Sequence, residues 1–246
     1  HIELLSGTSV YAVRYYVEFL NCNISACLVR PHFELKEIEA SGEFKTFSGS
    51  EFVALGDSVI GVSSSSTKPH ITGNSEADKI IQGIAENRGY KLRGDAGSSN
   101  ASSEYNSMAS AASSEEGLNL HLGSHYRSVS VQRGIFMDQL SNNCSQNNYA
   151  NIINGNCNTE INNILKTYSI PGYSKHHTGY AIDLKCGSNG KYQDFKNSAC
   201  FSWLSANNYY NAKRFGFIPS YPVGGGNQGP DPEEWEYVLV GTDKLK

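Results

Sequence analysis

The sequence predicts a protein of the α+β class. Three observations support this prediction. Residues 1 to about 62 are rich in Val, Tyr and Phe and are interrupted by Gly turns, as in β structure. Residues 75–89 carry apolar side chains at helical spacing. Leu118, Leu120 and Leu122 alternate with polar residues, which is typical of a strand.

The N-terminal part of the chain reads as a separate β-rich unit. Residues 10–20 and 43–47 predict strands, and the Ser run at residues 63–66 predicts a polar linker. We therefore expect two domains: residues 1–70 as a β-rich accessory domain with its linker, and residues 71–246 as the main domain. The accessory domain either binds a partner or only enlarges the core.

Three helices are expected in the second part. The first covers residues 75–89, with Ser75 as its N-cap and Gly89 as its end. Residues 98–114 are rich in Ser and Ala but keep apolar side chains at helical spacing. Residues 201–215 predict an amphipathic helix whose core candidates are Trp203, Leu204, Tyr210 and Phe215.

Composition excludes several classes of function. A length of 246 residues allows a sizeable core in one large or two small domains. A net charge of −4 leaves no basic stripe for nucleic acid. No apolar run approaches the ~20 residues of a transmembrane helix. The first residue is His1 rather than Met, which suggests a mature chain after signal-peptide removal, although a truncated sequence would look the same. We expect a monomer.

The cysteines predict disulfide bonds. They are even in number and form three local pairs, none with C-x-x-C spacing: Cys22 with Cys27, Cys144 with Cys157, and Cys186 with Cys200. Buried free thiols are the alternative. Six cysteines allow about 15 pairings, of which local pairing is the simplest. Disulfides favour an extracytoplasmic location, and they would staple the polar loops at residues 142–163 and 186–200.

Two short segments carry the candidate chemistry. One runs from residue 171 to residue 184 and offers the His176 imidazole and the Asp183 carboxylate. The other, residues 233–237, adds Glu233 and Glu236 beside Trp235. One His and two carboxylates can ligate a divalent cation, and a further Glu can act as general base. A solvated surface turn with an acidic strand is the simpler interpretation of residue chemistry alone.

These segments resemble a known family. Residues 174–183 resemble the S-x-H-x-x-G-x-A-x-D signature of the VanY-like metallopeptidases, which are D,D- and L,D-carboxypeptidases that trim peptidoglycan stem peptides. Four further segments match in order: S-G-Y-R-S-x-x-x-Q at residues 124–132, Pro-Gly at 171–172, W-x-x-x-N-A-x-x-x-G-F-x-x-x-Y-P near 203–222, and E-P-W-H-Y-x-x-V-G at 233–241. Together they cover roughly residues 75–246, and five ordered matches are more specific than one motif.

The resemblance implies a fold, a cofactor and a substrate. It implies a small antiparallel sheet with helices, as in the VanY and hedgehog-like zinc peptidases. It implies that a peptidoglycan stem peptide is the substrate and that the protein works in the periplasm or outside the cell. The implied residue roles are Zn²⁺ ligation by His176, Asp183 and Glu236, general base catalysis by Glu233, a carboxylate clamp at Arg127, and helper positions at Ser128, Gln132 and Ser174.

Three positions depart from the family pattern: Glu236 replaces the His of E-P-W-H, Glu234 replaces its Pro, and His125 replaces the Gly of S-G-Y-R-S. The last metal ligand of the family is the His of E-P-W-H, and here it is Glu236. An anionic ligand would leave the site one charge less positive, so we expect a less acidic attacking water and a better tolerance of Mn²⁺. His125, which replaces the Gly of the family, is an alternative third ligand. His177 is expected to be a rim or core residue.

Other functions stay open at this level. An endopeptidase would use Arg127 for a side-chain carboxylate, and a structural salt bridge would leave Arg127 no substrate role. A wall-binding pseudoenzyme would bind the peptide without cleaving it, because the third His ligand is lost. A hedgehog-like signalling protein is a third alternative.

Overall fold

The structure, a computed structural model, describes the backbone of residues 10–22, 27–38, 44–61, 67–145 and 148–246, and the side chains from residue 44 onward within these ranges. The chain divides into two compact units, His1–Lys45 and Thr46–Leu245. Within the described ranges, no helix is both long and apolar enough to cross a membrane.

The first unit contains a long β-hairpin. Strand β1 (Val10–Cys22) pairs antiparallel with β2 (Cys27–Ile38), which confirms the β-rich prediction for this part of the chain. The register places Cys22 opposite Cys27 at the turn end of the hairpin. The predicted disulfide between them lies outside the described side chains and stays a prediction.

A helix follows where the sequence suggested β structure. Helix α1 (Gly49–Ile60) begins with a capping box, in which Ser48 and Glu51 each accept a backbone N–H from the other. It buries Phe52 and Ile60 and belongs to the second unit. The prediction of a β-rich unit over residues 1 to about 62 was therefore wrong for residues 49–60, which are helical, and residues 44–47 form no strand. The proposed boundary at residue 70 lies inside the second unit, its linker lies outside the described residues, and the accessory role of the N-terminal part stays a prediction.

The second unit is built on a small antiparallel sheet, which confirms the predicted α+β class. Its strands are β3 (Leu120–Ser124), β4 (Ala181–Cys186), β5 (Phe217–Pro219) and β6 (Glu236–Leu239). Their order across the sheet is β3-β4-β6-β5, with β4 and β6 in the centre. The alternation from Leu118 onward correctly predicted β3.

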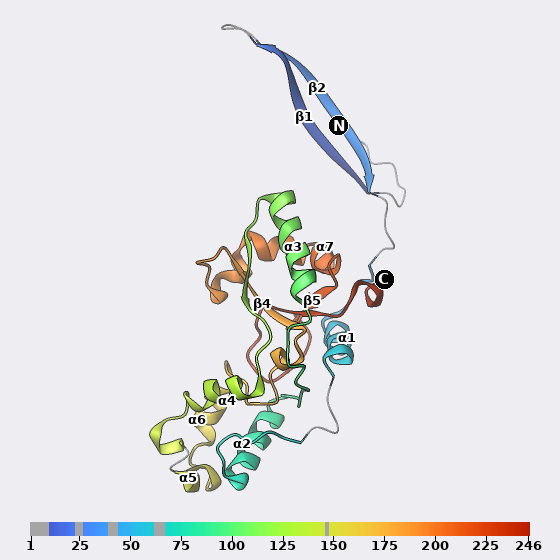
Figure 1. Cartoon of the computed structure of the whole chain (residues 1–246). Coiled ribbons are helices and arrows are strands. Elements are labelled where there is room, and N and C mark those ends of the chain that lie inside the picture. The colour runs from blue at the N-terminus through green and yellow to red at the C-terminus, as the bar shows by residue number, and fades with distance from the viewer. Residues whose placement is uncertain (1–9, 23–26, 39–43, 62–66, 146–147) are drawn as a thin grey trace. The chain divides into compact units, whose positions relative to one another are not determined.

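One face of the sheet packs on two helices. Helices α3 (Ser102–Glu116) and α7 (Ala199–Lys213) lie together beside the sheet (Figure 1) and form with it one hydrophobic core. That core takes Ile182 and Leu184 from β4 and Tyr237 and Leu239 from β6. Because strand side chains alternate, the residues between them face the other way.

A second core lies at the opposite end of this unit (Figure 1). It contains α2 (Ser75–Asn87), α4 (Val129–Met137), α5 (Tyr149–Ile153) and α6 (Asn158–Ile164). The N-cap of α2 is Asn74, whose side chain accepts the N–H groups of Glu76 and Ala77, and not Ser75 as expected. Gly89, with φ of 98°, ends the helix as predicted.

Helix α7 is interrupted rather than continuous. Asn207, Asn208 and Tyr209 adopt positive φ inside it. The Asn208 side chain accepts the N–H and donates to the carbonyl of Phe47, both at 2.9 Å, so a contact distant in sequence overrides the helical pattern. Trp203 and Leu204 are buried as predicted, whereas Tyr210 is exposed.

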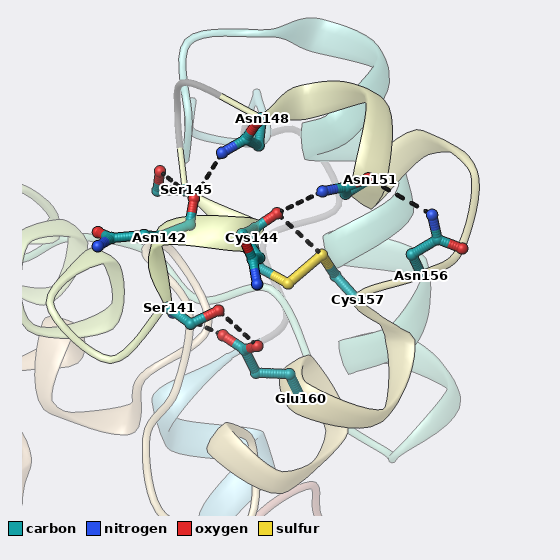
Figure 2. The surroundings of a disulfide bond; sticks show 10 residues. Ser141, Asn142, Cys144, Ser145, Asn148, Asn151, Asn156, Cys157 and Glu160 are labelled. Carbon is teal, nitrogen blue, oxygen red and sulfur yellow. Dashed lines mark hydrogen bonds between the residues drawn. A yellow bond between two sulfur atoms is a disulfide. The ribbon is translucent and has the colours of Figure 1, made fainter.

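Two of the three predicted disulfides are present, Cys144–Cys157 and Cys186–Cys200. The first lies in residues 142–163, where the structure has helices α5 and α6 in place of the expected loop. The Asn side chains of this segment bond to its backbone: Asn148 donates to the carbonyl of Asn142 (Figure 2), and Asn151 donates to the carbonyl of Asn143. These side chains satisfy backbone groups that short helices leave unpaired.

Peptide mapping without reduction should recover three local disulfides, including Cys22–Cys27. Replacing Cys144 and Cys157 by Ala should lower the free energy of unfolding by about 3 kcal/mol, because the bond closes a loop with a sequence separation of 13. Urea denaturation measures the loss. Crossed pairings in the map, or unchanged stability of the double variant, would contradict this account.

Candidate metal centre and substrate cleft

The register of the two central strands places two carboxylates side by side. Asp183 of β4 is directly opposite Glu236 of β6, and Ser124 of β3 is opposite Asp183 on its other side. Directly opposed residues have Cβ atoms about 5 Å apart. Asp183 and Glu236 point away from the helical core, and both are buried. The sheet therefore fixes a pair of carboxylates on its open face.

The imidazole arrives from the turn that precedes β4. Residues Lys175–Thr178 form a short 3-10 helix, which ends at Gly179 with φ of 73°. A side chain at Gly179 would collide with the carbonyl oxygen of Ser98. His176 Nδ1 lies 2.8 Å from the carbonyl oxygen of His125, which can only accept, so Nδ1 carries the proton. Nε2 is thereby directed at the carboxylates and is the ring nitrogen that can bind a metal ion.

These three residues fit a single cation. His176 Nε2 lies 3.3 Å from Asp183 Oδ2 and 3.4 Å from Glu236 Oε2. Tetrahedral zinc with ligands at about 2.1 Å separates its ligand atoms by about 3.4 Å, which these two spacings match. Asp183 Oδ1 is buried without a hydrogen-bond partner among the described residues. Within the described part of the chain, this is the group of His, Cys, Asp and Glu able to hold a metal ion.

The electrostatics of the cluster favour a cation. Burial lowers the pKa of His176, but the carboxylates of Asp183 and Glu236 outweigh it and raise that pKa to about 10. Burial raises the pKa of Glu236, but Lys175, His176 and Ser220 together lower it to about 2. Glu236 therefore stays ionised, and it lies directly opposite Asp183, which favours a cation between them.

Glu236 has a partner that the sequence analysis missed. The Lys175 side chain is buried and its Nζ lies 3.7 Å from Glu236 Oε1. Lys175 Nζ donates to Ser220 Oγ at 2.6 Å, and the Ser220 hydroxyl donates to Glu236 Oε1. Burial lowers the pKa of Lys175 to about 8, which still leaves it mainly protonated at neutral pH. A lysine next to the first His ligand was the only sequence signal of this contact.

Glu233 lies at the edge of the same cluster. The N–H of Glu236 donates to the carbonyl of Glu233 at 3.1 Å, so a tight turn brings both carboxyl groups to the cleft. Burial raises the pKa of Glu233, and the charges of Glu236 and Asp183 raise it further, to about 9. A carboxyl group with such a pKa is protonated at neutral pH and can deliver that proton, and it can accept a proton only once it has ionised.

Arg127 faces the cleft with its charge uncompensated. Its Nη1 donates to Gln132 Oε1 at 2.8 Å and its Nη2 donates to Ser124 Oγ at 3.3 Å. Both acceptors are neutral, and no ion pair involves Arg127 among the described side chains. The structural salt bridge considered above is thus not found there. Gln132 is itself fixed, because its Nε2 donates to the carbonyl of Ser169 at 2.6 Å.

Two consecutive histidines hold the backbone that carries this arginine. His176 Nδ1 binds the carbonyl of His125, and His177 Nδ1 lies 2.6 Å from the carbonyl oxygen of Arg127. His177 Nε2 accepts the N–H of Gly172 at 3.0 Å, so both of its ring nitrogens are used. His177 is fully buried, which confirms it as a core residue. The metal candidate and the arginine are therefore held by one peptide segment.

A cleft of about 510 Å³ joins these groups. It is lined by Arg127, Ser174, His176, Asp183, Glu233 and Glu236, together with residues not singled out from the sequence: Tyr168, Tyr173, Tyr192, Tyr221, Gln228 and Trp235 among others. Tyr192 and Trp235 pack with ring centroids 5.5 Å apart. Aromatic residues scattered along the chain gave no local signal that they would share a wall.

Three predicted site residues do not line the cleft. Ser128 caps α4, where its hydroxyl accepts the N–H of Val131. Gln132 is fully buried behind Arg127. His125 has an exposed side chain and contributes its carbonyl to the site, so it is not the substitute ligand considered above. Ser174 caps the turn that carries His176 and accepts its N–H at 3.3 Å.

The family model VanY, described as D-alanyl-D-alanine carboxypeptidase, matches residues 96–242, which is more than half of the chain. No curated protein matches the sequence significantly.

Solved structures of three peptidases are similar to this chain. One is the vancomycin-resistance D,D-pentapeptidase VanY from a VanB-type cassette in complex with Zn(II): 22% identity over 63% of this chain and 80% of that one, with a TM-score of 0.43. The LD-carboxypeptidase LdcB is 19% identical over 76% of this chain and 69% of that one, with a TM-score of 0.40. DacB from Streptococcus pneumoniae is 24% identical over 59% of this chain and 68% of that one, with a TM-score of 0.41.

The raised pKa of Glu233 predicts a pH-dependent stability of the metal-free protein. The folded state holds the Glu233 proton up to about pH 9, whereas an ordinary Glu releases it near pH 4.5. The contribution of Glu233 to stability therefore falls as pH rises between these values. Glu233→Gln, which mimics the protonated form, should be more stable than the parent at pH 8 in the presence of a chelator. The difference should shrink toward pH 4.5.

Melting curves by circular dichroism across this range provide the measurement. The exposed Glu76→Gln is the matched control and should show no such trend. A pH-independent difference for Glu233→Gln would mean that Glu233 is not held in a desolvated, anionic setting.

Proposed function

Because this chain belongs to the VanY family of D-alanyl-D-alanine carboxypeptidases, we propose that it is a zinc-dependent peptidase that removes a terminal D-amino acid from peptidoglycan stem peptides. The observation that carries the proposal is one cleft with opposite charge at two points. The carboxylates of Asp183 and Glu236 lie at one, and the uncompensated guanidinium of Arg127 lies at the other. A carboxypeptidase needs this pairing, because its substrate ends in a carboxylate next to the bond that is cleaved.

Zinc would be held by His176, Asp183 and Glu236. The spacing of their ligand atoms, the unpaired Asp183 Oδ1 and the mixed nitrogen and oxygen donors support this assignment. When bound, zinc supplies Lewis acidity, which polarises the scissile carbonyl and favours ionisation of the attacking water. The carbonyl of His125 fixes the orientation of the His176 ring for this role.

Arg127 would bind the terminal carboxylate of the peptide. Its planar guanidinium can donate two parallel hydrogen bonds to a carboxylate. The guanidinium donates to Gln132 and Ser124, which are both neutral, so its positive charge would remain available for the substrate. The buried Gln132 and the histidine contacts to the backbone limit the rotamers of Arg127, which reduces the entropy cost of binding.

Glu233 would move the proton. It would accept a proton from the attacking water and deliver it to the leaving amine. Its position in the cleft and its raised pKa support delivery to an amine near neutral pH. The aromatic rings of Tyr192 and Trp235 would pack against the peptide and exclude bulk water from this transfer.

We propose an extracytoplasmic location, since two disulfides staple the catalytic unit and the substrate of the family is the cell wall. Incubating the protein with muropeptides and measuring product masses tests the reaction. Loss of one terminal residue is expected. Cleavage within the peptide would favour the endopeptidase alternative, and binding without cleavage would favour the pseudoenzyme.

The carboxylate clamp predicts a non-additive pair of changes. Arg127→Ala and amidation of the C-terminus of the substrate should each lower kcat/KM, by about 100-fold, because each deletes the same charged hydrogen bonds. Combining them should add little further loss. Kinetics of both enzymes on both substrates measure the coupling. Additive losses would assign Arg127 another role, and an unaffected amidated substrate would point to an endopeptidase.

The ligand assignment predicts three metal-binding outcomes. Glu236→Ala should lose zinc, because a ligand is removed. Glu236→His should keep zinc and shift the pH profile of activity toward acid, since the site becomes one charge more positive. His125→Ala is the control and should keep zinc, because only its carbonyl contacts the site. Metal analysis after dialysis and pH-rate profiles provide the readouts. Full zinc and activity in Glu236→Ala would remove Glu236 from the ligand set.

A further inference from the structure

Lys175 is a buried residue beside the candidate metal centre that the ligand assignment does not explain. It lies one residue before the His176 ligand, and its side chain is 6% exposed. A buried ammonium is costly unless its three protons and its charge are matched. Lys175 Nζ donates to Ser220 Oγ at 2.6 Å, to Gln228 Oε1 at 2.9 Å and to the carbonyl of Ser220 at 3.2 Å. Its charge lies 3.6 Å from the Tyr221 ring centroid and 3.7 Å from Glu236 Oε1.

The two oxygens of Glu236 have different surroundings. Oε2 faces His176 Nε2 at 3.4 Å, within the ligand group. Oε1 accepts the Ser220 hydroxyl and faces the ammonium of Lys175. Ser220 accepts from Lys175 and donates to Glu236, so the three residues form one directed chain of hydrogen bonds. The backbone N–H of Ser220 also donates to the carbonyl of Glu236 at 3.0 Å, which keeps the serine in place.

A carboxylate in place of a histidine ligand creates two difficulties. It adds a negative charge to a buried site, and it offers a second oxygen that can also bind the metal. Lys175 addresses the first, because its positive charge balances that of Glu236 at short range. The chain through Ser220 addresses the second, because it occupies Oε1 and turns Oε2 toward His176.

We propose that Lys175 is a positioning residue for Glu236. The pair of Lys175 and Glu236 is neutral overall, and Glu236 binds the metal through one oxygen, as a histidine ligand would bind through one nitrogen. The inference rests on the proposed zinc site. It revises the expectation from sequence alone that the site is one charge less positive than in the family, since the added negative charge is balanced within the protein.

The first test is a double-mutant cycle on the metal-free protein. Lys175→Met leaves Glu236 buried without its cation and should lower Tm by about 10 °C. Glu236→Gln alone leaves the ammonium without its anion and should also lower Tm. The double variant should be more stable than Lys175→Met, because the charge that needed a partner is gone. Additive losses would show that the two charges do not interact and would overturn the proposal.

The second test reports the geometry on a metal. Co²⁺ replaces Zn²⁺ in many sites, and its visible d–d absorption weakens as coordination number rises. In Lys175→Met, the Ser220 hydroxyl loses the donor that orients it and Oε1 loses its nearby cation, so Oε1 is held less firmly and can bind the metal. The absorption of the Co²⁺ protein should therefore weaken. Lys175→Arg, which keeps the charge, should preserve most of it. Lys213→Met, which removes a buried lysine that does not line the cleft, is the control and should leave the spectrum unchanged.

The outcomes separate the two claims. A parent protein that takes up no Co²⁺ would refute the metal site of the proposed function, whatever the melting data. A parent that binds Co²⁺, with an unchanged spectrum in Lys175→Met, would refute the positioning role alone and leave Lys175 as a structural residue.

Discussion

The antiparallel register between β4 and β6 is the constraint on which the site depends. It sets Asp183 against Glu236 on the open face of the sheet and sets Ile182 beside Tyr237 on the face that packs against α3 and α7. A shift of one residue would exchange the two faces. It would bury carboxylates in the apolar core and expose the core residues to the cleft. The hydrophobic effect that selects the register therefore also assembles the pair of carboxylates.

The charged groups at the two ends of the cleft differ in their partners, and this difference bears on the proposed function. The Glu236 carboxylate is surrounded by groups that favour its ionised form, Lys175 and His176 among them, and the Asp183 carboxylate lies 3.3 Å from His176 Nε2. Arg127 is surrounded by neutral acceptors. Buried charges without compensation are costly, so each arrangement requires support from the fold. Because Gln132 and Ser124 are neutral, the charge of Arg127 stays available for the terminal carboxylate that we propose it binds.

Residues 174–183, which carry the family signature, link the two ends of the cleft through hydrogen bonds. His176 and His177 bind the carbonyl oxygens of His125 and Arg127, two positions on the segment that leaves β3. One of these rings also contributes to the candidate metal centre, and the other also binds the turn at Gly172. The distance between the candidate cation site and the guanidinium is thus set by buried hydrogen bonds, as the proposed alignment of a terminal carboxylate with the adjacent peptide bond would require.

The sequence by itself determined the elements and the chemistry that local patterns encode. Alternation at Leu118, Leu120 and Leu122 predicted β3, spacing predicted α2 and α3, and the proximity of cysteines predicted two disulfides that are present. The order of short motifs selected His176, Asp183, Glu236 and Arg127 as candidates, and the structure places all four in one cleft. Local patterns failed where contacts distant in sequence intervene, as in the break of α7 caused by Asn208 and Phe47.

Only the tertiary structure decided how these residues work together. The opposition of Asp183 and Glu236 depends on a register between strands more than fifty residues apart in the chain, which no local pattern encodes. The pairing of Lys175 with Glu236 through Ser220 joins three separate segments, and the exposure of His125 depends on the backbone direction after β3. Burial and the orientation of charges arise when segments pack, so residue types are readable from the sequence whereas their electrostatic partners are not.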